Sequence, residues 1–158
     1  MKTVVIYYSR GGTTKKMAEI IAEELKSKKV STDIFSVEDI SADKLLDYDG
    51  IVVGGPTYYG TLPYQIKKLF DDSVKFHGKL DGKVGMAFSS SANIAGGNET
   101  TVLSILEAML IHGMVIQGDH KGDHYGPVAV GSVDKRCEEN CRRMAQRFAK
   151  LLSKIMIG

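Results

Sequence analysis

The chain has 158 residues, of which 43% are hydrophobic and 25% are charged, a composition that is ordinary for a globular protein. Its formal net charge is +2, from 21 basic and 19 acidic residues, and this does not indicate nucleic-acid binding. No apolar run approaches the length of about 18 residues that a membrane span requires, and two cysteines provide no disulfide framework. We therefore expect a single domain over residues 1–158, located in the cytoplasm and not in a membrane.

The first segment combines a buried strand with a glycine- and hydroxyl-rich turn. Residues 4–8 (VVIYY) are uninterrupted in their apolar character, which is typical of a strand covered on both faces. From Thr14 onward the apolar residues take a helical spacing. A strand, a small-residue turn and a helix start direct free backbone N–H groups toward an anion. The turn thus predicts a phosphate site made of Ser9, Arg10, Gly11, Gly12, Thr13 and Thr14.

Several kinds of phosphate loop can be compared with this turn. A Walker loop requires Gly-Lys-Ser/Thr after four intervening residues, and a dinucleotide fold requires Gly-x-Gly-x-x-Gly; the turn contains neither pattern. The kind of phosphate loop that still fits this turn is one in which hydroxyl and backbone groups surround the phosphate. The alternative is a Ser/Thr/Gly turn that merely caps a helix, and this segment alone leaves both interpretations open.

Strand and helix patterns alternate along the rest of the chain, which predicts a doubly wound parallel sheet with helices on both faces. The predicted strands are 4–8, 31–37, 50–55, 82–88 and 114–117. The predicted helices are 14–29, a short one within 38–49, one from about residue 62, 99–112 and 134–156. We expect the five strands in the order 2-1-3-4-5, with a ligand at the carboxyl ends of strands one, three and four.

Two further small-residue loops follow the strands at 50–55 and 82–88, and they complete the expected site. One runs from Pro56 to Thr61 and the other from Ser89 to Gly97. Their candidate binding residues are Pro56, Thr57, Tyr58, Tyr59, Gly60, Ser89, Ser90, Ser91, Ala92, Asn93, Gly96 and Gly97.

Together the three loops resemble the FMN-contacting loops of the flavodoxin fold. The detailed match is similar to WrbA-like NAD(P)H:quinone oxidoreductases, which carry Pro-Thr-(Arg)-aromatic-Gly and Gly-Gly-(Gln)-Glu-Thr-Thr; here these motifs are residues 56–60 and 96–101. The resemblance covers the whole chain and implies a flavodoxin-like fold that binds one FMN. The chain is shorter, lacks the segment that WrbA proteins insert in the second half of the sheet, and has Tyr58 where they often have arginine. Quaternary structure, including a homo-oligomer, and substrate stay open.

The resemblance also implies roles for individual residues. Tyr58 or Tyr59 would supply a stacking face for the isoalloxazine ring, and Gly60 would permit close approach at its reactive N5 edge. Groups of Ser90 to Gly97 would bond the pyrimidine edge and the ribityl chain. The alternative for the two tyrosines is an ordinary half-buried surface. We expect Tyr59, Gly60 and His124 as the catalytic residues.

His124 belongs to a loop, residues 118–127, that contains a doubled Gly-Asp-His. We expect this loop on the substrate side of the flavin, with His124 or Tyr125 facing a quinone or nicotinamide; a polar surface loop is the alternative. Two histidines and two aspartates also make a metal conceivable, but no third histidine or cysteine is near, so we expect no metal site. Cys137 and Cys141 fall on the apolar seam of the last helix and are expected to pack in the core.

Two functions fit these features. One is an FMN enzyme that moves a hydride from NAD(P)H to a quinone-like acceptor, and the other is a one-electron carrier between redox protein partners. The three loops contain a single charged residue, Arg10. Acidic carriers surround the reduced flavin with negative charge, which this chain lacks, and we therefore favour the enzyme. A phospho-receiver is excluded because Tyr8 and Ser9 stand where it needs an acidic pair.

Overall fold

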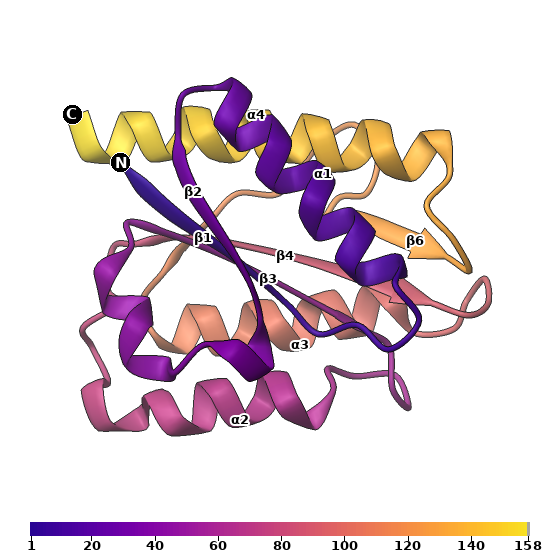
Figure 1. The fold of residues 1–158 in the computed structure, drawn as a ribbon, viewed down its shortest axis with the longest axis horizontal. Coiled ribbons are helices and arrows are strands. Elements are labelled where there is room, and N and C mark those ends of the chain that lie inside the picture. The colour runs from indigo at the N-terminus through magenta and orange to yellow at the C-terminus, as the bar shows by residue number, and fades with distance from the viewer. Residues whose placement is uncertain (158) are drawn as a thin grey trace.

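The computed structural model describes residues 1–157, which form a sheet between two layers of helices (Figure 1). The strands are β1 (Lys2–Tyr7), β2 (Ser31–Ser36), β3 (Gly50–Pro56), β4 (Val84–Ser91), β5 (Val115–Ile116) and β6 (Val128–Val130). The α-helices are α1 (Thr13–Ser27), α2 (Tyr64–Asp72), α3 (Asn98–Ile111) and α4 (Lys135–Ile157). Three short 3₁₀ helices are η1 (Val37–Asp39), η2 (Ala42–Asp47) and η3 (Ser73–Phe76).

The order of the strands confirms the prediction, because the paired path runs β2-β1-β3-β4-β5 with every pair parallel. The sheet also has a sixth strand that was not predicted. β5 pairs with the start of β4 and β6 with its end, opposite Ser89–Ser91. The position of a fifth strand is thus divided between two short strands, and residues 117–127 connect them.

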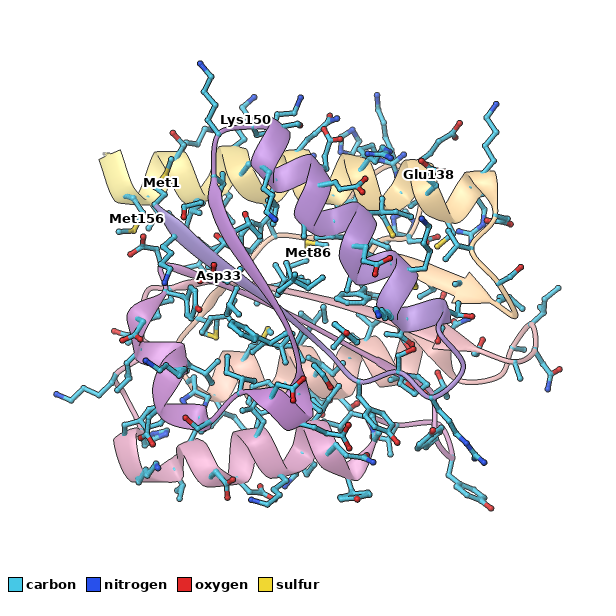
Figure 2. The ribbon with its side chains drawn as sticks, in the orientation of Figure 1. Met1, Asp33, Met86, Glu138, Lys150 and Met156 are labelled. Carbon is cyan, nitrogen blue, oxygen red and sulfur yellow. The ribbon has the colours of Figure 1, made fainter. Side chains whose placement is uncertain are left out.

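Both faces of the sheet are covered by helices, as the unbroken apolar strands predict. One core joins Val5 and Met86 to α1 and α4, and the other joins Val4 and Ile6 to α2 and α3. Met86 lies between the sheet and the α1–α4 layer, whereas the side chain of Lys150 points away from the sheet (Figure 2). Within residues 1–157, no helix has both the length and the apolar character needed to cross a membrane.

Glycines in β3 allow the sheet to pack closely where it approaches the predicted site. A Cβ atom at Gly54 would lie 2.2 Å from the ring of Phe88, and one at Gly55 would lie 2.6 Å from Ile66. Cβ atoms do not approach side chains this closely, so any larger residue would displace a buried side chain. These two positions therefore hold the end of β3 against its neighbours.

Residues 117–127 are fastened to α4 by ion pairs that use both aspartates of the doubled Gly-Asp-His. Arg143 Nε donates to Asp119 Oδ2 at 2.6 Å, and Arg136 contacts Asp123 at 2.8 Å. Burial raises the pKa of Asp119, but the hydrogen bonds from Arg143 and the Lys121 N–H outweigh it and leave that pKa below its ordinary value. The aspartates of this motif therefore connect the loop to a helix.

The two cysteines of α4 are buried, as predicted. Cys137 and Cys141 are both inaccessible to solvent and belong to the core beneath α1 and α4. The hydrogen bond that the Cys141 thiol donates to Cys137 and burial both raise the pKa of Cys141. A thiol that stays protonated is a poor nucleophile, so the surroundings of Cys141 favour a packing role.

We predict that replacing both cysteines by serine lowers the free energy of unfolding by about 2 kcal/mol or more, because two hydroxyls enter an apolar core. Urea denaturation followed by circular dichroism measures this loss. Glu139→Gln, on the exposed side of α4, is the control and should unfold like the wild type. Unfolding of the double variant at the control's urea concentration would contradict the burial of these thiols.

Candidate functional site

The loops that follow β1, β3 and β4 meet at the carboxyl edge of the sheet and line one cleft of ≈ 470 Å³. Its lining residues are Ser9, Arg10, Gly11, Thr13, Thr14, Pro56, Thr57, Tyr58, Ser90, Ser91, Ala92 and Gly131. Two hollows of ≈ 370 and ≈ 410 Å³ flank α2, but none of the three loops lines them. The cleft at the strand ends is therefore the candidate site.

The first loop presents the start of α1 to this cleft. Gly12 is the residue before the helix, in a left-handed conformation (φ 96°), and no side chain caps the helix. Helical geometry leaves the N–H groups of the first turn, beginning at Thr13, without intrahelical acceptors. Together with the positive end of the helix dipole, these groups form a binding site for an anion such as phosphate.

The hydroxyls of the first loop mainly hold the loop in shape. Ser9 Oγ accepts a hydrogen bond from the Gly12 N–H at 3.1 Å, and Thr13 Oγ1 donates to the Gly131 carbonyl at 2.9 Å. The buried hydroxyls of Thr14 and Ser90 are 2.8 Å apart. One bond between two hydroxyls uses one of their two protons, so this pair keeps a donor for a ligand.

The second loop contains a tight turn with two residues in the left-handed region. Tyr58 and Thr61 exchange backbone hydrogen bonds of 3.1 and 3.2 Å, and between them Tyr59 (φ 50°) and Gly60 (φ 79°) have positive φ angles. A positive φ is unusual for a bulky residue such as Tyr59 and is a source of strain. The turn leaves the side chain of Tyr59 fully exposed.

Tyr58, by contrast, lines the cleft and contacts the end of β1. Its ring and that of Tyr8 meet edge to face, with centroids 6.3 Å apart. Partial desolvation raises the pKa of Tyr8, and so does the neighbouring Tyr58. The Tyr8 hydroxyl therefore stays protonated at physiological pH and puts no negative charge beside the Tyr58 ring.

The third loop is joined to the second by hydroxyls from the start of α3. Thr100 Oγ1 donates to the Gly60 carbonyl at 2.6 Å, and Thr101 Oγ1 contacts Thr57 Oγ1 at 3.0 Å. A Cβ atom at Gly97 would lie 2.8 Å from the Cα of Gly60, so only glycine lets the two loops approach this closely. The Gly-Gly-x-Glu-Thr-Thr motif therefore positions the second loop.

The structure brings most of the predicted site residues together, but not all of them into the cleft lining. The predicted residues outside the lining are Gly12, Tyr59, Gly60, Ser89, Asn93, Gly96, Gly97 and His124. Ser89 is fully buried in β4, which continues three residues past its predicted end, so the third loop begins at Ala92.

His124 is exposed and lines a separate, smaller hollow with Glu99 and Tyr125. Its Nδ1 atom lies 2.7 Å from the Asp119 carbonyl oxygen. Its expected catalytic role stays a prediction.

Sequence reasoning missed Gly131 as a residue of the cleft. Gly131 follows β6; its N–H donates to Ser91 O at 2.7 Å, and its carbonyl accepts from Thr13. It therefore joins the first and third loops. The apolar run Val128-Ala129-Val130, which ends at this glycine, is the signal that could have indicated it.

The Flavodoxin family model matches residues 5–152. The chain belongs to the flavodoxin family. Proteins of this family bind FMN, and FMN is the cofactor of this chain.

Relatives in this family carry two different names. A flavodoxin of Aquifex aeolicus (strain VF5) is 37% identical, over 99% of this chain and 90% of the relative. An NAD(P)H dehydrogenase (quinone) of Sinorhizobium fredii is 36% identical, over 74% of this chain and 70% of the relative. Among solved structures, a WrbA-like flavodoxin from Agrobacterium tumefaciens has a TM-score of 0.81 at 27% identity, over 97% of this chain and 98% of the other. Similarity therefore extends to both kinds of flavoprotein.

The donor set and the free space of the cleft fit FMN. Cβ atoms built at Gly11 and Gly12 meet no protein atom within 4 Å, so the start of α1 is open to a phosphate group. Arg10 adds a positive charge beside the backbone donors, and Tyr58 offers an aromatic face. These features provide for the phosphate and for the flat ring of the cofactor.

We predict that Gly11→Val weakens FMN binding about tenfold or more while leaving the free energy of unfolding nearly unchanged. The added side chain meets no protein atom at its Cβ, and it occupies the space beside the helix start. Titration of FMN into cofactor-free protein measures the affinity, and urea denaturation measures the stability.

The matched control is Gly97→Ala. This residue has a φ of 94°, and its added Cβ would meet the Gly60 backbone at 2.8 Å, so stability should fall as well as affinity. Wild-type FMN affinity in Gly11→Val would place the phosphate elsewhere.

Proposed function

We propose that this chain is an FMN-dependent oxidoreductase that takes a hydride from NAD(P)H and reduces a quinone-like acceptor by two electrons. The observation that supports the proposal most is the charge of the cleft. Among its lining residues the single charged side chain is that of Arg10, a cation. A cationic and otherwise neutral wall stabilises an added negative charge, whereas nearby carboxylates would oppose it.

The residues of the chain would divide the work of holding the cofactor. The N–H groups at the start of α1 would bind the phosphate. The Ser90 and Ser91 hydroxyls and the backbone of the third loop would bond the ribityl chain and the polar edge of the ring. Bound FMN supplies the chemistry, because its ring accepts a hydride and passes on electrons.

The rim of the cleft would receive the second reactant. Tyr59 and Ile94 are exposed apolar residues on the second and third loops. Their side chains carry no charge and suit a flat, uncharged ring such as a quinone better than a charged partner. Tyr59, Gly60 and His124 remain our candidates for contact with the reacting groups.

A second candidate function is a one-electron carrier between redox proteins. The share of each relative's length that this chain matches favours it. The chain matches 90% of the length of the Aquifex flavodoxin, but only 70% of the Sinorhizobium quinone dehydrogenase. Segments that the quinone dehydrogenases add to this fold are therefore absent from the match. A carrier would present the same cofactor edge to a protein surface.

We predict that NADH or NADPH bleaches the bound FMN without an auxiliary reductase, and that benzoquinone restores its colour. The measurement is anaerobic stopped-flow absorbance at the oxidised-flavin band, with product analysis for the two-electron reduced quinone. Arg10→Gln should slow bleaching about tenfold, because it removes the cation beside the cofactor. Lys29→Gln, on a residue exposed beyond the end of α1, is the charge-matched control.

The outcome separates the two functions. An FMN protein that reacts with neither nicotinamide, yet exchanges electrons rapidly with a reduced iron–sulfur protein, is the carrier. Equal bleaching rates in the Arg10 and Lys29 variants would remove the electrostatic argument for the enzyme.

A further inference from the structure

The turn at residues 58–61 is held by the side chain of Thr100, a residue to which the proposed function gives no role. The Tyr58 and Thr61 backbones bond to each other, which leaves the Gly60 carbonyl at the tip of the turn. Within residues 1–157, the hydrogen bond recorded to this carbonyl comes from Thr100 Oγ1, at 2.6 Å. Thr100 lies forty residues further along the chain, in the first turn of α3. The contact therefore fixes the tip of the turn to a rigid helix.

The Thr100 hydroxyl has two possible acceptors. Thr100 Oγ1 lies within bonding distance of two carbonyl oxygens, Gly60 O at 2.6 Å and Gly97 O at 2.9 Å, but it has one proton to donate. The Gly97 carbonyl already accepts a hydrogen bond from the Thr101 N–H at 3.0 Å. The Gly60 carbonyl makes the shorter contact with Thr100 and, in the part of the chain that the structure describes, has no other donor. The proton is therefore directed to Gly60.

The turn needs this support because its conformation is strained. Tyr59 is held at φ 50°, a conformation that is unfavourable for a bulky residue and persists only where neighbouring contacts enforce it. The Thr100–Gly60 contact is one such constraint. The close approach of Gly97 to Gly60 restricts the same peptide from the other side.

We propose that Thr100 is a positioning residue for the flavin site: its hydroxyl holds the Gly60 carbonyl and thereby keeps Tyr58 and Tyr59 oriented for the cofactor ring. The inference rests on the proposed placement of FMN in this cleft. It assigns a task to the first threonine of the Gly-Gly-x-Glu-Thr-Thr motif. The second, Thr101, is buried and joins Thr57 to Gly97.

The test compares Thr100→Val, which keeps the branched shape and removes the hydroxyl, with Thr100→Ser, which keeps the hydroxyl. Thr100 is exposed, so both variants should fold, and urea denaturation checks this. In cofactor-free protein, amide hydrogen exchange is measured at Tyr58 and Thr61. We expect exchange about three- to tenfold faster in Thr100→Val, the change that loss of one hydrogen bond produces, and wild-type exchange in Thr100→Ser.

The same variants are then titrated with FMN. Thr100→Val should bind FMN about three- to tenfold more weakly and quench its fluorescence less, because the tyrosines are no longer fixed against the ring. Thr100→Ser should restore both values.

Two failures can be told apart. Absence of FMN binding by the wild type would overturn the proposed function, and with it the role of Thr100 at the cofactor. Wild-type FMN binding together with unchanged exchange and affinity in Thr100→Val, or equal defects in both variants, would overturn the positioning role alone.

Discussion

The site depends on the register in which β1, β3 and β4 pair. Tyr7 lies opposite Gly54, and Gly54 lies opposite Phe88, so the three strands deliver their loops to one edge of the sheet. This register requires a residue without a side chain at Gly54, because a Cβ atom there would lie 2.2 Å from the Phe88 ring. Beyond this packed layer β3 and β4 stay paired as far as Pro56 and Ser90, and both of these residues line the cleft. The geometry of a cofactor site is thus determined by a steric constraint inside the sheet.

Above that layer, hydroxyls and backbone amides have different tasks. The hydroxyls of Ser9, Thr13 and Thr100 are engaged with other parts of the protein, and each one fixes a loop. The amides at the start of α1 have no such partners in the helix and face the cleft. Loops that are already held in place lose little conformational freedom when a ligand binds, and under our proposal the amides at the start of α1 would supply the attraction for its phosphate.

Local patterns in the sequence were sufficient for the strand order, the helical layers and the three loops, because parallel strands that are buried on both faces leave long apolar runs. Shorter features were missed. β6 has three residues, Val128–Val130, too few to show a periodicity, and its partner Ser89–Ser91 looks like loop because serine has no preference for strands. The hydrogen bond between Thr100 and Gly60 spans forty residues and depends on the turn geometry, which no local pattern reveals. The same holds for the arginines of α4 that pair with Asp119 and Asp123, since neither partner indicates the other in the sequence.

The rim of the cleft bears on the choice between the two functions. Tyr59 and Ile94 are 107% and 86% exposed, and each lies in or next to a residue with a positive φ angle, Tyr59 itself and Ala95. Strained backbone that presents apolar side chains to water is stabilised when a ligand covers them.

An aromatic side chain buries at most about 250 Å², whereas a specific protein interface buries about 800 Å² on each partner. These two residues therefore suffice to cover a small flat acceptor. A protein partner would need much more of the protein surface, on which charged residues such as Lys15 and Lys16 of α1 are exposed. Contact with this charged surface makes carrier activity sensitive to ionic strength, because salt screens the attraction between exposed lysines and a partner. Reduction of an uncharged quinone at the rim involves no such attraction, and the two functions thus differ in a property of the surface as well as in the number of electrons transferred.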